Sequence, residues 1–302
     1  MEKGEVISIV YLNGDYQPIE EAKVSVNDRA FLFADAVYEA IPVYSGTIFL
    51  PDRHHARLDR GLGEVAIAFD VADLDGVCEE LITRNGLADE EFGVFYLQVT
   101  RGVAPRSHAF PKTPVAPTVY AFVGPLARAT PEQWDAGYAA ITLPDQRWGR
   151  ADIKCTALLP NVLAQQAAAE ADVTDAAFVR EGLVTEGTHN NVFAVIDGVL
   201  VTAPADHRIL HGITRQFILD LAVELGIAVE ERPVEESEFR GADEIFFTGT
   251  TTEVRPTVFL DGEPVGTGVP GPITRLLSER YRRAVDEAIS TCSSRAPAGR
   301  RR

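Results

Sequence analysis

The sequence predicts an α+β fold built from two successive groups of strands and helices. Turns at Asn13-Gly14, Ser45-Gly46 and Asp197-Gly198 connect short apolar strands as hairpins. Runs of strands and runs of helices follow one another without strict alternation, and this favours α+β over a doubly wound parallel sheet. The chain has 302 residues, which is enough for about two domains that each bury a hydrophobic core.

The composition is that of a globular protein, with 46% hydrophobic and 24% charged residues. The formal net charge of −17 argues against nucleic acid and anionic membranes as partners, because both would repel the average surface. We find neither a signal peptide nor an apolar run of the roughly 18 residues that a membrane span needs. The three cysteines, Cys78, Cys155 and Cys292, are widely spaced and odd in number, which is typical of a reducing compartment. We therefore expect a cytoplasmic protein.

The first predicted domain covers residues 1–124 and opens with a hairpin of strands at 7–12 and 16–26. Pro51 is expected to open a helix, because its fixed φ suits the first helical position. The other strands of this domain are expected at 37–44, 47–50, 92–102 and 118–124, and a second helix near 73–85.

Residues 125–136 contain two prolines and no clear periodicity, so they are predicted to form an interdomain linker before a larger domain at 137–290. In that domain Thr156 is expected to cap a helix at about 158–171, with Pro160 in its first turn. Gly212 is expected to precede an amphipathic helix whose free amides form an anion site. The tail, residues 291–302, is predicted to be disordered.

Lys154 is one of only four lysines, and it lies between Ile153 and a run of small and apolar residues. Burial disfavours the charged form of an amine, and the neutral amine is the species that condenses with an aldehyde. A surface lysine at the end of a strand is equally compatible with the residues themselves.

Glu186 follows an apolar strand and a turn, and it precedes a segment rich in Asn and Gly that suits a loop around a ligand. A carboxylate at this position could face the ring nitrogen of pyridoxal phosphate (PLP). That cofactor accepts electrons only while its pyridine nitrogen stays protonated, and a buried acid is the usual way to keep the proton there.

Several cations elsewhere have an ordinary interpretation when taken alone. Taken alone, Arg57 is interpreted as a charged residue on the solvent-exposed side of a helix, and His54 and His55 as a pair of surface histidines. The loop VAPRSHAFP presents Arg106 and His108 two residues apart, on one side of an extended segment. Without other information this loop reads as a surface turn with two exposed cations.

Three motifs together resemble the fold type IV PLP enzymes. The pattern IK-x-x-x-LL-x-x-x-LA-x-Q-x-A, followed by TEG-x-x-x-NVF, carries the lysine and the glutamate in order. RAFLFADAVYEAI resembles the aminotransferase signature, and RG-x-x-PR-x-H-x-FP resembles the D-amino acid aminotransferases. The resemblance covers nearly all of residues 7–285. It implies a small α+β domain and a larger β pseudo-barrel domain with helices, with PLP between them.

The resemblance also implies a role for each matching residue. Lys154 corresponds to the Schiff-base lysine and Glu186 to the partner of the pyridine nitrogen. The remaining cofactor contacts are implied for Arg57, Leu210, Ile213, Thr214 and Thr250, and the substrate contacts for Tyr38, Arg106, His108 and Thr251, of which Tyr38, Arg106 and His108 would bind the α-carboxylate.

The activity implied is transfer of an amino group from a D-amino acid to a 2-oxo acid such as 2-oxoglutarate, with ping-pong kinetics. In relatives the Arg-x-His loop reaches the neighbouring subunit, which implies a homodimer. Thr188 and His189 stand where these enzymes often carry serines, and the segment around Phe31 is less polar than usual. An (R)-selective amine transaminase is therefore the first alternative, followed by an L-branched-chain aminotransferase and aminodeoxychorismate lyase.

Overall fold

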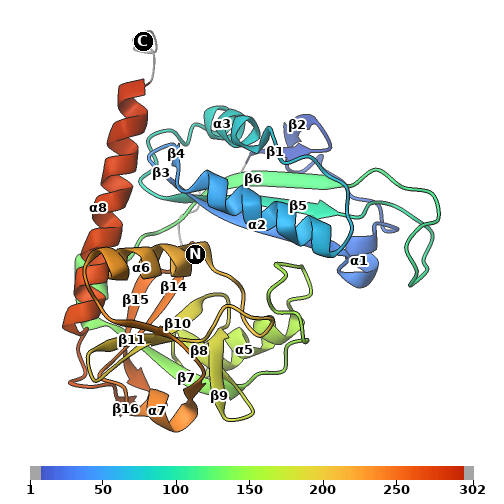
Figure 1. The fold of residues 1–302 in the computed structure, drawn as a ribbon. Coiled ribbons are helices and arrows are strands. Elements are labelled where there is room, and N and C mark those ends of the chain that lie inside the picture. The colour runs from blue at the N-terminus through green and yellow to red at the C-terminus, as the bar shows by residue number, and fades with distance from the viewer. Residues whose placement is uncertain (1–7, 296–302) are drawn as a thin grey trace. The chain divides into compact units, whose positions relative to one another are not determined.

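The computed structural model describes residues 8–295, and the contacts within it divide the chain into two compact units (Figure 1). Unit 1 comprises Met1–Arg128, Ile153–Ala157 and Val285–Arg302, and unit 2 comprises Ala129–Asp152 and Leu158–Ala284. The short segment around Lys154 thus belongs by its contacts to unit 1. No helix among the described residues has the length and apolar character needed to cross a bilayer.

Unit 1 contains a six-stranded antiparallel sheet in the order β2-β1-β6-β5-β3-β4. Its strands are β1 (Ile9–Leu12), β2 (Asp15–Pro18), β3 (Ala36–Tyr44), β4 (Thr47–Ile48), β5 (Gly93–Thr100) and β6 (Val119–Pro125). The turn between β1 and β2 needs positive φ at Asn13 (54°) and Gly14 (103°), which this dipeptide adopts readily. The second strand of the predicted hairpin is shorter than expected and ends at Pro18.

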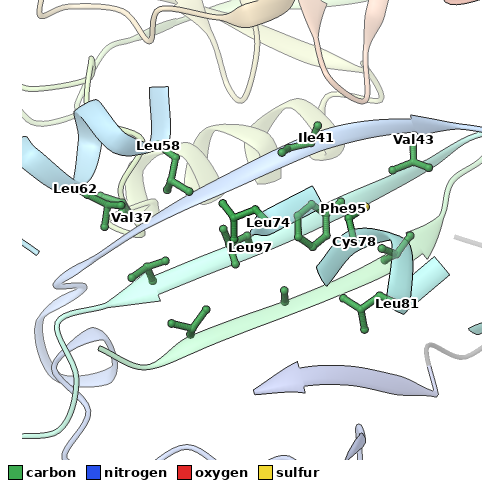
Figure 2. Packing of buried hydrophobic residues seen from close by; sticks show 14 of the residues in the cluster. Val37, Ile41, Val43, Leu58, Leu62, Leu74, Cys78, Leu81, Phe95 and Leu97 are labelled. Atoms are coloured by element: carbon green, nitrogen blue, oxygen red, sulfur yellow. The ribbon is translucent and has the colours of Figure 1, made fainter. Parts of the chain in front are cut away.

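Helices α2 (Pro51–Glu64) and α3 (Leu74–Asn85) pack against one face of this sheet, whereas α1 (Arg29–Phe33) is a single short turn. Alternate residues of β3, β5 and β6 point toward the helices because side chains of a strand alternate between its two faces. Figure 2 shows this core, which includes Val37, Ile41, Val43, Leu58, Leu62, Leu74, Cys78, Leu81, Phe95 and Leu97. Pro51 opens α2 as the sequence predicted.

Unit 2 contains a ten-stranded mixed sheet in the order β12-β11-β10-β14-β15-β7-β8-β9-β13, with β16 paired to β15. The strands are β7 (Tyr138–Pro144), β8 (Asp175–Arg180), β9 (Leu183–Gly187), β10 (Asn191–Ile196), β11 (Val199–Thr202), β12 (Val229–Glu231), β13 (Val234–Glu235), β14 (Glu244–Gly249), β15 (Glu253–Leu260) and β16 (Glu263–Pro264). Strands β9 and β10 are distant in this order, yet Asn191 Nδ2 of β10 lies 3.0 Å from Glu186 Oε2 of β9. The sheet therefore curls on itself as a half-barrel, and the α+β prediction is confirmed.

The helices of unit 2 are α4 (Pro131–Ala136), α5 (Leu159–Glu170), α6 (Ile213–Glu224) and α7 (Glu236–Arg240), and α8 (Pro272–Arg295) begins in this unit. The predicted linker is not irregular throughout, because Thr130 and Gln133 form a capping box that starts α4. The predicted cap of α5 is wrong. Leu158 is the N-cap, and the Thr156 hydroxyl donates to Ala34 O (3.2 Å) instead.

The expected tail begins at residue 291, but the described part as far as Arg295 continues α8. Residues 296–302 lie outside the described residues, as do residues 1–7 at the other end. The domain limits expected from the sequence stay predictions.

Candidate active site

Lys154 lies in a segment that extends the sheet of unit 1 along the free edge of β3. Tyr38 N donates to Lys154 O (2.9 Å), Thr156 N donates to Ala36 O (3.2 Å), and Val37 and Cys155 form an antiparallel bridge. Strand β4 pairs only with the far end of β3, so this edge would otherwise leave its backbone groups unpaired. Ile153 and Cys155 insert into the core of the unit, and the lysine between them points the other way.

The side chain of Lys154 meets an aromatic row on the face of the sheet opposite the helices. Its Nζ lies 4.2 Å from the centroid of the Tyr38 ring. Tyr38 stacks on Tyr96 (5.6 Å between centroids), and Tyr96 stacks on Phe122 (5.2 Å). An ammonium group over an aromatic face is attracted by the electrons of the ring. The structure therefore brings together Lys154 and Tyr38, two of the predicted site residues.

Arg57 forms an ion pair with Glu39, a residue that sequence reasoning missed. Arg57 Nη2 lies 2.6 Å from Glu39 Oε1 and Nε lies 2.9 Å from Oε2, so the contact is bidentate. His54 Nδ1 lies 3.2 Å from the same carboxylate, and its ring is buried. The prediction of a surface histidine is thus wrong for His54. It follows from the i, i+3 spacing of His54 and Arg57 that both reach one side of α2.

Burial alone would raise the pKa of Glu39, but Arg57 and His54 outweigh it and hold that pKa far below its usual range. Burial lowers the pKa of His54, although Glu39 opposes this shift. The fully buried carboxylate therefore stays charged and fixes the arginine that the sequence assigned to a phosphate.

Arg106 and His108 lie in an exposed loop without regular structure, and both contact Phe33. The Arg106 guanidinium carbon lies 5.1 Å and the His108 ring 5.3 Å from the centroid of the Phe33 ring. Within the part of the chain that the structure describes, Arg106 forms no ion pair. The loop thus presents a cation that is available to an external anion.

In unit 2, Glu186 is a buried residue of β9 whose carboxylate accepts three hydrogen bonds. Asn191 Nδ2 (3.0 Å) and Leu210 N (2.9 Å) donate to Oε2, and Arg147 donates to Oε1. Burial raises the pKa of Glu186 to about 7, against the opposing effect of Arg147 and the Leu210 amide. Two donors occupy the lone pairs of Oε2, whereas Oε1 keeps one acceptor position for a further N–H.

Arg147 and Asn191 support Glu186 and were not found from the sequence. Arg147 also binds Asp145 Oδ2 (2.8 Å) and Arg208 O (3.1 Å), so its guanidinium is fixed from two directions. Asn191 Nδ2 donates to Leu210 O (2.9 Å) as well as to Glu186. The asparagine stood in the quoted TEG-x-x-x-NVF pattern and could have been assigned from it, whereas no local signal marks the arginine.

The start of α6 combines three predicted cofactor residues, Leu210, Ile213 and Thr214. Gly212 is the N-cap and supplies no side-chain hydrogen bond to the first turn. A Cβ at Gly212 would lie 2.0 Å from Asn191 Oδ1, so only glycine lets this helix start approach the Glu186 cluster. Uncapped amides at the start of a helix favour an anion such as a phosphate.

The turn between β14 and β15 carries two of the predicted contact residues, Thr250 and Thr251. Thr250 is half-buried and Thr251 is exposed. The hydroxyls of Thr248 and Thr252 are buried and have no hydrogen-bond partner among the described residues. The turn therefore offers polar groups to a ligand. The hydroxyls without a partner belong to Thr248 and Thr252, which flank the predicted residues Thr250 and Thr251.

The segment after Glu186 is anchored by Asp175, a buried residue of β8. Asp175 Oδ1 accepts from the Thr188 hydroxyl (2.7 Å) and backbone amide (3.2 Å), and Asn190 Nδ2 donates to Oδ2. His189 points outward, with Nδ1 2.9 Å from the Thr188 hydroxyl. Thr188 thus has a structural partner, and His189 is the exposed member of the pair.

Each unit, taken by itself, carries groups that suit pyridoxal phosphate. In unit 1 these are the Lys154 amine, which lies over the Tyr38 ring, and Arg57, which is held by the buried Glu39. In unit 2 they are the buried Glu186 carboxylate, with a spare acceptor position on Oε1, and the uncapped start of α6. An aldehyde, a phosphate and a ring N–H are the groups that such residues bind.

Residues 36–258 match the amino-transferase class IV family, and the chain belongs to it. Class IV aminotransferases are PLP enzymes of fold type IV, so the fold, the enzyme class and the cofactor predicted from the sequence are confirmed. The chain is 42% identical to a D-alanine aminotransferase of Bacillus licheniformis over 88% of its length and 93% of that protein. It is 38% identical to a D-alanine aminotransferase of Staphylococcus aureus (strain MSSA476), over 92% of this chain and 98% of that one.

Among solved structures the chain resembles a branched-chain aminotransferase from the thermophilic archaeon Thermoproteus uzoniensis, solved with norvaline. The TM-score is 0.81 at 27% identity, and the likeness covers 93% of this chain and 95% of that chain. Another branched-chain amino acid aminotransferase, solved with pyridoxamine 5'-phosphate, gives a TM-score of 0.83 at 28% identity, with the same shares of the two chains covered.

Proposed function

We propose that this chain transfers the amino group of a D-amino acid to a 2-oxo acid such as 2-oxoglutarate. The similarity to two D-alanine aminotransferases supports the choice of substrate. The observation that carries it is the loop with Arg106 and His108, which presents two basic side chains and no paired acid within the described residues. A loop of this kind suits the carboxylate of an amino acid.

When bound, PLP supplies an aldehyde that takes up the amino group and a ring that accepts electrons. Lys154 is proposed to bind the cofactor covalently, and its freed amine then moves the proton at the substrate Cα. The lysine is suited to both roles because the backbone of β3 fixes its position while its side chain rests on an aromatic ring.

Glu186 is proposed to hold the proton on the ring nitrogen through the remaining acceptor position of Oε1. Arg147, Asn191 and Leu210 orient this carboxylate and keep it from rotating. A pyridinium beside Glu186 would favour the ionised carboxylate and so lower its pKa from the value near 7.

Arg57, the amides of Ile213 and Thr214, and Thr250 are proposed to hold the phosphate, and Leu210 is proposed to contact the cofactor ring. Glu39 already holds Arg57 in one orientation, so little side-chain entropy is lost when the anion binds. The substrate is proposed to contact Tyr38, Arg106, His108 and Thr251. We further propose a homodimer in the cytoplasm.

Replacement of the carboxylate-binding arginine tests this assignment against amine transamination. We expect Arg106→Ala to lower kcat/KM for D-alanine by about 30-fold or more, or about 2 kcal/mol, because a charge-assisted contact is lost. The variant should leave kcat/KM for (R)-1-phenylethylamine within about twofold, since that amine has no carboxylate.

Equal losses on the two substrates would show that the loop is structural. A wild-type preference for (R)-1-phenylethylamine or for L-leucine over D-alanine would instead favour an (R)-amine transaminase or a branched-chain aminotransferase.

A further inference from the structure

The loop of Arg106 and His108 lacks regular secondary structure, but one buried side chain holds its backbone. The Arg29 guanidinium donates to three successive carbonyls, those of Ser107 (2.6 Å), Ala109 (3.4 Å) and His108 (3.5 Å). Arg29 is only 2% exposed. N–H groups of one planar guanidinium thus hold the loop backbone at residues 107–109, directly after Arg106 and on both sides of His108.

Arg29 is in turn held by Asp35, which it shares with Arg101. Asp35 Oδ2 accepts from Arg29 Nε (2.7 Å) and from Arg101 Nε (2.8 Å), and Oδ1 accepts from Arg101 Nη2 (2.9 Å). Burial raises the pKa of Asp35, but the two guanidiniums outweigh this and hold it below its usual value. Arg101 also lies 3.5 Å from the centroid of the Phe110 ring, at the far end of the loop.

Phe33 provides a common platform for these cations. Its ring centroid lies 4.9 Å from the guanidinium carbon of Arg29 and 5.1 Å from that of Arg106, and 5.3 Å from the His108 ring. Guanidinium groups and imidazoles stack on aromatic faces. Both exposed basic side chains of the loop therefore rest on one ring, and the same ring contacts the arginine that holds their backbone.

We propose that Phe33 and Arg29, with Arg29 held by Asp35, are positioning residues that set Arg106 and His108 for the substrate carboxylate. This inference rests on the proposed function, because it takes Arg106 and His108 as the residues that bind the substrate carboxylate. Phe33 and Arg29 themselves are assigned no contact with the substrate. Without the platform, Arg106 and His108 would lose side-chain freedom only when substrate binds, and that entropy would weaken binding. With it, the two side chains are ordered in advance.

The test compares Phe33→Leu and Arg29→Gln with wild type, each as the PLP-loaded enzyme. We expect KM for D-alanine to rise by about 10- to 100-fold, while kcat and the Kd for PLP stay within about threefold. Trypsin should cleave after Arg106 faster in both variants, because the loop is released. In the Phe33→Leu/Arg106→Ala double variant, KM should rise by clearly less than the product of the two single effects, since the ring acts in part through that arginine.

Two matched controls lie in the same unit. Tyr16→Leu removes a ring whose centroid lies 4.7 Å from the Arg84 guanidinium carbon, and Arg84→Gln removes the arginine that lies over this ring and pairs with Glu80. Neither should change KM or the rate of cleavage.

Several outcomes would overturn the proposal. They are an unchanged KM in both variants, a loss confined to kcat, a parallel loss of PLP affinity, and additive effects in the double variant. If Arg106→Ala itself leaves KM for D-alanine unchanged, the substrate assignment under the proposed function fails. If Arg106→Ala raises KM and Phe33→Leu does not, only the positioning role fails.

Discussion

At the scale of single residues, the site depends on a few side chains whose charge is set by buried partners. Glu39 is held charged by Arg57 and His54, and Glu186 is surrounded by donors but lies deep enough for burial to raise its pKa. Lys154 differs from both, because its side chain contacts an aromatic ring and its backbone completes a sheet. These three environments lead to separate predictions.

Lys154→Ala should abolish transamination and leave PLP bound without a covalent link. The reason is that the residues proposed to hold the phosphate, Arg57 and the start of α6, are unchanged. Activity is measured by keto acid release, and covalent attachment by borohydride reduction and peptide mapping. An adduct on Lys3, Lys23 or Lys112, or turnover near wild type, would refute the assignment.

Glu186 should make the stability of the cofactor-free protein depend on pH. Its folded pKa of about 7 lies above 4.5, the ordinary pKa of a glutamate side chain. The folded state therefore binds the proton more tightly, and this stabilisation is present below pH 4.5 and is lost as pH rises through about 7. From about pH 5 to about pH 8, wild type should lose about 2 to 3 kcal/mol relative to Glu186→Gln.

The measurement is the free energy of unfolding in urea of both cofactor-free proteins at each pH. Parallel pH profiles of the two proteins would show that Glu186 does not titrate in this range. The PLP-loaded Glu186→Gln enzyme should retain the cofactor and slow the proton transfer in single turnover, since an amide cannot balance a pyridinium charge.

At the scale of elements, each unit positions its proposed cofactor residues by one close contact between two backbone segments. The segment 153–157 pairs with the edge of β3, and the start of α6 lies against β10 through Gly212. Neither contact depends on an exceptional φ, because residues 153–157 have no positive φ and Gly212 has a φ of −63°. The glycine is needed there for space.

Gly212→Ala should therefore weaken PLP binding by at least about tenfold, because the added methyl would displace Asn191 and with it the carboxylate of Glu186. The Kd for PLP is measured by quenching of protein fluorescence. Gly241→Ala is the control in the same unit, since its Cβ would meet atoms only at 3.7 Å, an ordinary contact distance. Equal affinities of the two variants would contradict the role of Gly212.

At the scale of the whole molecule, several large apolar side chains are exposed on the chain by itself. They include Phe31 (75%), Leu159 (69%), Val162 (59%), Leu163 (57%) and Phe110 (56%). Exposed apolar groups of this size on neighbouring positions of one helix, as in α5, are typical of protein interfaces. They support the proposed homodimer.

Light scattering should give the protein a mass of twice the 32.9 kDa of one chain at micromolar concentration. Leu163→Asp should shift this mass toward that of one chain, because a carboxylate buried in an apolar interface is costly. A wild-type mass of 32.9 kDa would rule out the stable dimer.

The sequence by itself determined the features that depend on neighbours along the chain. The hairpin at Asn13-Gly14, the helix opened by Pro51 and the helix start at Gly212 each follow from local backbone preferences, and the structure has them. The motifs around Lys154 and Glu186 were enough to predict the family, since the order and spacing of these residues match its pattern.

Only the tertiary structure decided which distant groups meet. Nothing local predicts that Glu39 pairs with Arg57, that Arg147 reaches Glu186, or that the Thr156 hydroxyl bonds Ala34 rather than capping α5. Each contact joins segments far apart in sequence, and each exists because a buried polar group must find a partner once strands and helices enclose it. Which partner it finds depends on register and packing, and those are properties of the whole fold.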